Sequence, residues 1–193
     1  MTAIAVIVAL IAASVITFGI IRPFDEPSSG PLKGALRQQC PAAKSVVIDD
    51  ISVPAGPVAG FCQEQLVNAA QIMRAARSYG LSAHVQEIGV MTAIGESGLR
   101  NIAFGDKAGP DSRGLFQQRK NWGPLASRMD PYLAARNFYG HLIGVPQFWK
   151  RPPTEVAHIV QGNADPEYYT QFTARAQIIV ATLRQRRNVS PWE

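Results

Sequence analysis

The sequence has few of the side chains from which metal sites and nucleophilic centres are built. It contains 2 cysteines and 3 histidines, and His84, His141 and His158 lack the spacing of metal ligands. Two thiols without a nearby histidine or a second cysteine pair do not fill a tetrahedral zinc site. We find no Ser-His-Asp or Cys-His arrangement and no glycine-rich phosphate-binding motif. The sequence therefore predicts neither a metal site nor a cofactor.

Charged residues are also sparse, at 17% of the chain, but cations outnumber anions. The 19 Lys and Arg against 14 Asp and Glu give a formal charge of +5, which favours a polyanion such as nucleic acid, anionic lipid or an acidic cell wall. The one tight basic run, residues 184–187, falls at the end of an expected helix, where cations complement the helix dipole. Because no basic stripe interleaved with aromatic residues accompanies it, nucleic acid is not an expected partner.

Charge is absent altogether from residues 3–21. Nineteen helical residues reach about 28 Å, close to the thickness of the bilayer core. We expect residues 1–21 to form an uncleaved transmembrane anchor. The alternative is a signal peptide, but such peptides carry a basic segment before a shorter apolar stretch, and neither Lys nor Arg precedes this run. Arg22, just after the span, mildly opposes export of the following domain.

Residues 22–60 are rich in proline and glycine and show no sustained helical period, which predicts a stalk or linker. A short extended piece near residues 46–48 is bounded by turn formers and would be an isolated strand. Cys40 and Cys62 flank part of this stretch. In an oxidising compartment such a pair readily closes a disulfide, whereas in the cytosol the alternative is two buried free thiols.

Beyond Gly60 the apolar residues take on helical spacing, and residues 61–187 are expected to form one mainly α domain followed by a tail over residues 188–193. No βαβ alternation is present, which argues against nucleotide-binding α/β folds. The expected helices are one that ends at Gly80, one from about Ser82 to Gly98, one that Asp130 caps and Pro131 begins, one that begins near Thr154, and one from Pro166 to about Arg187.

Glu96 is the most informative single residue. It lies at the end of an apolar helix and shares a stripe of that helix with Gly89 and Thr92. Small and apolar neighbours remove water from a carboxylate, which raises its pKa and keeps more of it protonated. A protonated carboxyl group is what a general acid needs. The alternative is a glutamate at a frayed helix end, exposed to water and without a catalytic role.

The motifs around Glu96 resemble those of a known family. Residues 96–101 read ESGLRN, residues 111–119 read DSRGLFQQR, and Trp122-Gly123 follows. This ordered set is similar to the lysozyme-like peptidoglycan hydrolases of actinobacteria, relatives of the soluble lytic transglycosylases, whose pattern is Glu-Ser, a loop, then Gly-Leu, a hydrophobic residue and Gln. The resemblance extends over about residues 62–183. Val160-Gln161 and Pro166-Glu167-Tyr168 are similar to the family's late motif.

The resemblance implies a lysozyme-like helical fold with a glycan cleft, Glu96 as the acid, and residues 114–118 on the wall opposite it. A glycine lets the backbone approach a sugar closely, and glutamine amides can bind acetamido and hydroxyl groups. Aromatic rings such as Trp122 can offer apolar faces to sugars, although Phe116 is more typical of a core residue. The predicted substrate-binding residues are Ser97, Asp111, Gly114, Leu115, Phe116, Gln117, Gln118, Trp122, Gln161 and Tyr168.

A second catalytic carboxylate is harder to find, although most glycosidases use two. The near candidates, Asp106 and Asp111, lie in a Gly/Pro loop where aspartate commonly caps a turn. The lytic transglycosylases are thought to need one carboxylate, because the substrate's acetamido group assists and the muramyl 6-hydroxyl closes on the anomeric carbon. The chain departs from their usual Ala-Tyr-Asn-Ala-Gly motif, having Gln161-Gly162-Asn163 and Tyr168 or Tyr169 instead.

The sequence thus predicts a membrane-tethered or secreted enzyme, with its domain on the cell-wall side, that cleaves peptidoglycan between N-acetylmuramic acid and N-acetylglucosamine. Lytic transglycosylase chemistry is favoured over hydrolysis. The expected partners are peptidoglycan and, through the N-terminal helix, the membrane. The alternative is a non-catalytic peptidoglycan-binding module of an envelope-spanning secretion or conjugation complex. An intact Glu96 favours the enzyme, because a scaffold has no need of a desolvated carboxylate.

Overall fold

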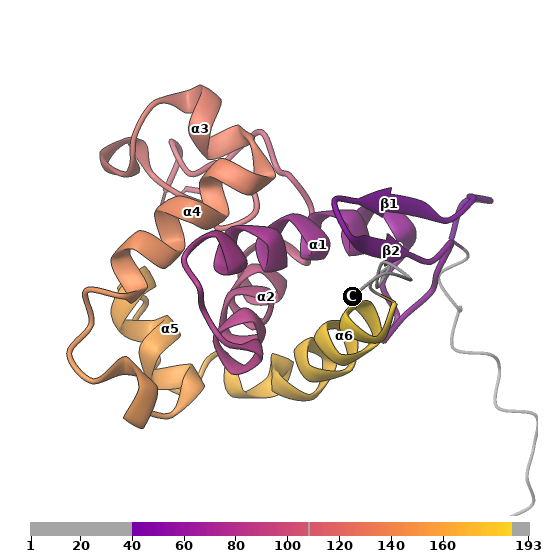
Figure 1. The fold of residues 1–193 in the computed structure, drawn as a ribbon. Helices are drawn as coiled ribbons and strands as arrows, with labels where there is room; N and C mark the ends of the chain where they lie inside the picture. The colour runs from indigo at the N-terminus through magenta and orange to yellow at the C-terminus, as the bar shows by residue number, and fades with distance from the viewer. Residues whose placement is uncertain (1–39, 108, 187–193) are drawn as a thin grey trace, which may run out of the picture. The chain divides into compact units, whose positions relative to one another are not determined.

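The computed structural model describes residues 40–107 and 109–186, and this part of the chain is mainly helical (Figure 1). Its strands are β1 (Val46–Ile48) and β2 (Ile51–Val53). Its α-helices are α1 (Gln63–Ser78), α2 (Ala83–Ser97), α3 (Leu125–Met129), α4 (Pro131–Leu142), α5 (Pro153–Gln161) and α6 (Thr173–Gln185). Short 3-10 turns are η1 (Lys120–Trp122), η2 (Phe148–Lys150) and η3 (Thr170–Phe172).

The predicted anchor or signal peptide, the first part of the predicted stalk and the C-terminal tail lie outside the described residues. Within residues 40–107 and 109–186, no helix combines the length and the apolar character needed to cross a bilayer.

Helix α2 lies at the centre of the helical body, between α1, α5 and α6 (Figure 1). Ten of its fifteen residues are buried, as expected of a helix that other helices surround. Two glycines allow this close packing. A Cβ atom at Gly89 would lie 2.1 Å from the Tyr139 hydroxyl oxygen, and one at Gly95 would lie 2.9 Å from the Tyr169 ring.

Local signals set the ends of α2 and α4 as predicted. The Ser82 side chain accepts a hydrogen bond from the Val85 amide at the start of α2, and Gly98 ends the helix in a left-handed conformation. The Asp130 carboxylate accepts from the Leu133 amide at 2.8 Å, and Pro131 occupies the first turn of α4. Helix α4 then packs along α1.

The predicted helix from Pro166 to about Arg187 is wrong in its first third. Asp165 accepts a hydrogen bond from the Glu167 amide, a turn and η3 follow, and α6 begins only at Thr173. The side chain of Tyr169 is fully buried within this turn. Helical periodicity alone predicts a continuous helix here. The structure instead has a turn at which the Tyr169 side chain is buried.

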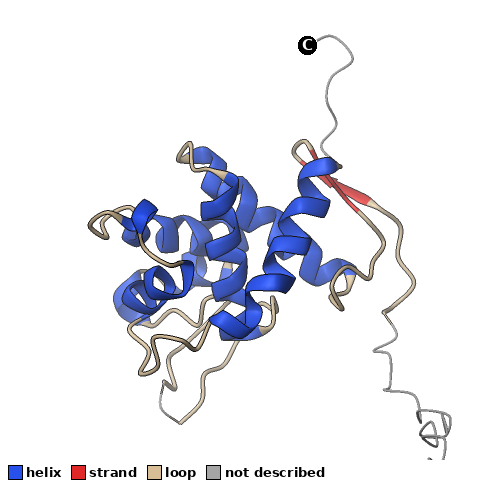
Figure 2. Ribbon diagram, turned by 90° about the horizontal axis from the view of Figure 1, so that it is seen from below, coloured by secondary structure: helices blue, strands red, loops and turns tan. Residues whose placement is uncertain are grey.

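Residues 40–60 are not a stalk, which corrects the predicted boundary at residue 60. Strand β1 pairs with β2 in antiparallel register, with Val46 opposite Val53, so the predicted isolated strand has a partner. Ile51 and Val53 are completely buried in the same core as the helices. Figure 2 shows the two strands at the edge of the helical body. Prolines and glycines in this segment form its turns rather than a free linker.

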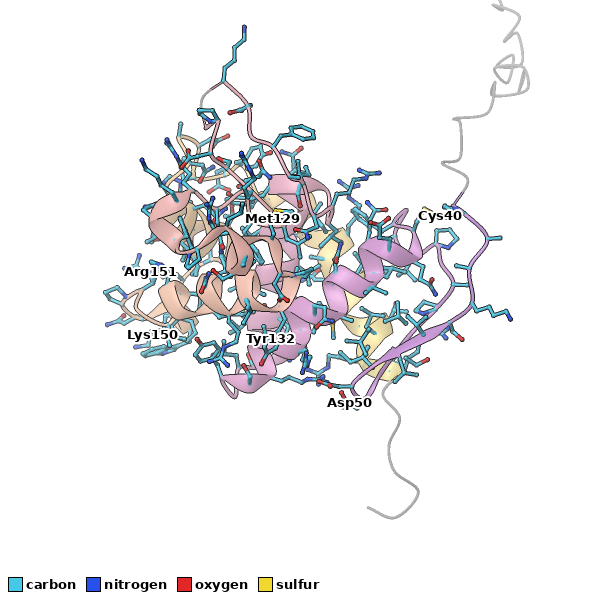
Figure 3. All side chains as sticks on the ribbon, turned by 90° about the horizontal axis from the view of Figure 1, so that it is seen from above. Cys40, Asp50, Met129, Tyr132, Lys150 and Arg151 are labelled. Atoms are coloured by element: carbon cyan, nitrogen blue, oxygen red, sulfur yellow. A yellow bond between two sulfur atoms is a disulfide. The ribbon has the colours of Figure 1, made fainter. Side chains whose placement is uncertain are left out.

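Polar contacts fasten this hairpin to the first and last helices. The Ser52 amide donates to the Arg186 carbonyl oxygen at 3.0 Å. Ion pairs join Arg74 to Asp49 at 2.5 Å and Arg77 to Asp50 at 2.7 Å. Asp50 lies at the hairpin turn in Figure 3. The folded domain therefore includes the hairpin as its N-terminal edge.

A disulfide links Cys40 to Cys62, as predicted for an oxidising compartment (Figure 3). Cys62 directly precedes α1, and its backbone amide donates to the Gln65 side chain at 3.0 Å. The bridge therefore ties the beginning of the hairpin segment to the beginning of the first helix, across a sequence separation of 22 residues.

Replacing both Cys40 and Cys62 by alanine should lower the free energy of unfolding by about 3 kcal/mol, because the unfolded chain regains the entropy of an open loop. Urea denaturation of the wild type and the double variant measures the difference. As a control, reductant should destabilise the wild type to the level of the variant and leave the variant unchanged. Equal midpoints for oxidised wild type and variant would contradict the role given to the bridge.

Candidate active site

Glu96 lies in the last turn of α2, with its carboxyl group half-buried. The Tyr169 hydroxyl, which comes from the segment before α6, donates to Glu96 Oε1 at 2.5 Å. Because Tyr169 is fully buried, its ring has little freedom to move, and the hydrogen bond fixes the orientation of the carboxyl group. Two segments 73 residues apart in the sequence thus meet at this one contact.

Burial raises the pKa of the Glu96 carboxyl above its ordinary value. Hydrogen bonding from Tyr169 and from the Gln161 amide acts in the opposite direction, but desolvation is the larger effect. Burial and the nearby Glu96 charge also raise the pKa of the Tyr169 hydroxyl, so that it remains a hydrogen-bond donor throughout the physiological range. The predicted desolvation of Glu96 is therefore present in the structure.

The late-motif residues lie beside this glutamate. Tyr168 donates from its hydroxyl to the Gly95 carbonyl oxygen at 2.9 Å, and its ring meets that of Tyr169 edge to face. Gln161, the last residue of α5, donates from Nε2 to the Phe116 carbonyl oxygen at 3.0 Å. Gln161 thereby connects the Glu96 side of the site to the segment that the sequence analysis placed opposite it.

Glu96 opens onto a cleft with a volume of about 860 Å³. Three segments of the chain form its walls: the loop around residues 102–112, the stretch 116–122 and the stretch 161–168. The side chains on these walls are aromatic, amide and charged. They include Phe104, Asp106, Phe116, Gln117, Arg119, Asn121, Trp122, Gln161, Asn163, Asp165 and Tyr168.

Five of the predicted substrate-binding residues line this cleft together with Glu96, namely Phe116, Gln117, Trp122, Gln161 and Tyr168. Phe116 is only 1% exposed and stacks on Phe138 with ring centroids 4.8 Å apart. It is therefore mainly a core residue, although it also contributes to the cleft wall. Trp122 is half-buried and packs against His141.

Ser97, Leu115 and Gln118 face the interior, which corrects their prediction as cleft residues. The Ser97 hydroxyl is buried, 2.8 Å from the Leu115 carbonyl oxygen and 3.0 Å from that of Ala93. Leu115 is completely buried. The buried Gln118 amide donates to the Ala134 carbonyl oxygen at 2.8 Å. Their hydrogen bonds hold the 114–118 segment against α2 and α4.

Gly114 and Asp111 also have structural roles and do not line the cleft. Gly114 has a φ of +75°, and a Cβ atom there would lie 2.0 Å from the Arg128 carbonyl oxygen. The glycine is therefore required by the neighbouring backbone, not by an approaching sugar. Asp111 accepts from the Lys120 amide and from Arg119 Nε, and these contacts lower the pKa of its carboxyl.

The cleft contains functional candidates that the sequence analysis did not select. Tyr169 was noted only as an alternative to Tyr168, yet it is the hydroxyl that binds Glu96. No sequence motif indicates Asp165, whereas Asp106 is a sequence candidate for the second carboxylate, with turn capping as its alternative role. Both aspartates line the cleft, and each also accepts a backbone amide: that of Gly109 for Asp106, at 2.8 Å, and that of Glu167 for Asp165, at 2.9 Å.

Comparison with known proteins adds no assignment: no protein-family model matches the chain, and no curated protein matches it with significant similarity.

Replacement of Glu96 by Gln should raise the melting temperature at pH 7 and have little effect at pH 4. The folded protein holds the Glu96 proton more tightly than the unfolded chain, because the carboxyl pKa is raised. The stabilisation that this tighter proton binding contributes to the folded state is therefore fully present below the ordinary glutamate pKa of about 4.3. It is lost as the pH rises through the raised pKa of Glu96. The neutral amide avoids that loss. Calorimetry at both pH values measures it.

Tyr169→Phe provides the matched comparison. Its hydroxyl stabilises the charged carboxylate, so its removal should make stability fall more steeply with rising pH than in the wild type. A Glu96→Gln variant that is less stable than the wild type at pH 7 would contradict a desolvated Glu96. So would a melting temperature that differs from that of the wild type by the same amount at pH 4 and at pH 7.

Proposed function

We propose that the chain cleaves the glycan strands of peptidoglycan between N-acetylmuramic acid and N-acetylglucosamine, within a helical domain similar to those of lysozymes and lytic transglycosylases. The observation that carries this proposal is a carboxyl group with a raised pKa on the wall of an open cleft lined by aromatic and amide side chains. The motifs ESGLRN and DSRGLFQQR provide independent support from the sequence.

Glu96 acts as the general acid in this proposal. Cleavage of a glycosidic bond requires a proton on the leaving oxygen, and a raised pKa keeps that proton available near neutral pH. Once the proton has left, the Tyr169 hydroxyl stabilises the carboxylate through its hydrogen bond. The same carboxylate can then accept a proton in the second half of the reaction.

Other groups in the cleft suit an N-acetylated glycan. The amides of Gln117, Asn121 and Asn163 can each donate to and accept from hydroxyl and acetamido groups. Trp122 offers an aromatic surface beside them. A cleft that mixes apolar rings with amides matches a pyranose, which has apolar C–H faces and a polar rim.

We infer a reaction that uses one protein carboxyl group. Glu96 protonates the leaving oxygen while the substrate's acetamido oxygen bonds to the anomeric carbon. Glu96 then takes the proton of the muramyl 6-hydroxyl, whose oxygen displaces the acetamido oxygen and leaves a 1,6-anhydromuramyl end. The loop aspartate Asp106 and the turn aspartate Asp165 already accept backbone amides, which favours a turn-capping role for both.

The proposed location is the cell-wall side of the membrane, where peptidoglycan is found. The Cys40–Cys62 disulfide is in keeping with an oxidising compartment. Residues 3–21 would provide the anchor or the export signal.

Glu96→Gln should reduce clearing of cell-wall material by at least about 100-fold, because the amide keeps the shape of the side chain but has no acidic proton to donate. A zymogram of the full-length chain on purified cell wall measures the activity. The matched control is Asp111→Asn. This substitution weakens the contacts of residue 111 with Arg119 and Lys120, so the loop becomes less ordered and activity should fall only modestly.

Full activity of Glu96→Gln would reject Glu96 as the acid. Tight binding of the wild type to the wall without any cleavage would instead favour the non-catalytic module of an envelope complex.

A further inference from the structure

Phe104 is the most exposed of the large hydrophobic side chains that the described residues present to solvent. Its side chain is 72% exposed, yet it lines the cleft that contains Glu96. An aromatic ring left in water beside a polar cleft contributes nothing to the core of the free protein. Its burial by a ligand would remove a large apolar area from water.

The loop that carries Phe104 is held by close backbone contacts. At its base the Gly114 amide donates to the Ile102 carbonyl oxygen at 2.7 Å. Beyond Phe104, a Cβ atom at Gly105 would lie 1.8 Å from the Gly109 carbonyl oxygen, so this turn leaves no room for a side chain. Asp106 closes the same turn by accepting from the Gly109 amide. The ring is thus presented from a preorganised turn.

The groups around Phe104 indicate what kind of molecule would cover it. Asp106 and Asp165 place two carboxylates in the same cleft, and the one cationic side chain among the described residues of its walls, Arg119, is paired with Asp111. This charge balance disfavours nucleic acids and other polyanions that would enter along their charged backbone. A purely apolar ligand would displace water from these polar groups without replacing the hydrogen bonds that the water makes. A neutral N-acetylated pyranose offers both a C–H face for the ring and hydroxyl and acetamido groups for the polar side chains.

We propose that Phe104 is a sugar-stacking platform that binds a pyranose ring of the glycan strand and thereby sets substrate affinity. This rests on the proposed function, because it takes the ligand of the cleft to be a glycan. Phe104 contributes no acid or base. It positions the strand along the wall formed by the 102–112 loop.

Calorimetric titration of the full-length Glu96→Gln chain tests the platform, with a tetrasaccharide of alternating N-acetylglucosamine and N-acetylmuramic acid whose lactyl carboxyl groups are capped as N-methylamides and therefore carry no charge. Adding Phe104→Ala should raise the dissociation constant by about tenfold or more, as expected for loss of one buried aromatic ring. Phe104→Tyr keeps the flat ring and should restore affinity to within about twofold. Phe104→Leu keeps apolar bulk without the ring and should remain weak.

Trp149→Ala is the matched control, because Trp149 is another exposed aromatic, at 65%, and does not line this cleft. It should leave the dissociation constant unchanged. In the catalytically intact chain, Phe104→Ala should raise KM and leave kcat nearly unchanged, which a loss of folding would not do.

Equal affinity of Phe104→Ala and its parent would overturn the platform and leave the proposed function standing. A parent chain that binds no glycan at all would overturn both. Weakening by Trp149→Ala as large as that by Phe104→Ala would also overturn the platform, since any exposed aromatic would then have the same effect.

Discussion

The structure depends on one constraint: helix α2, most of whose residues are buried, carries a carboxyl group in its last turn, on the wall of the cleft. Helix α2 packs against α1, α5 and α6, and Gly89 and Gly95 bring tyrosine rings against its backbone. The apolar surroundings that make α2 a core helix are the same surroundings that raise the pKa of Glu96. The packing of α2 in the core and the raised pKa of Glu96 therefore have a common cause, so a substitution that loosens this packing should also lower that pKa.

The remaining elements hold the surroundings of that carboxyl group in place. Ser97 fastens the 114–118 segment to α2 through the Leu115 carbonyl oxygen, and Gln161 fastens it to α5 through the Phe116 carbonyl oxygen. Tyr169 brings the segment before α6 to Glu96 itself. Several residues of the sequence motifs thus affect the proposed chemistry only indirectly, because they hold the backbone around the cleft in place. Phe104 and Trp122 lie on the cleft walls, where a ligand can contact them.

The sequence predicted those features that depend on local chemistry. The capping residues Ser82 and Asp130 define helix ends, and the desolvation of Glu96 follows from its small and apolar neighbours. Features that depend on distant partners were missed. Three-residue strands gain stability only from the core that buries Ile51 and Val53, and the turn around Tyr169 needs the cavity that receives its ring. The inward direction of Gln118 likewise depends on α4, not on its own neighbours.

Mass spectrometry of glycan strands digested in ¹⁸O-labelled water tests most directly the claim that a single carboxyl group performs both proton transfers. The account predicts 1,6-anhydromuramyl ends without incorporated label, and retention of product formation in Asp106→Asn and Asp165→Asn. Reducing ends that contain ¹⁸O, together with complete loss of cleavage in either aspartate variant, would contradict it and would indicate a hydrolase with two carboxylates.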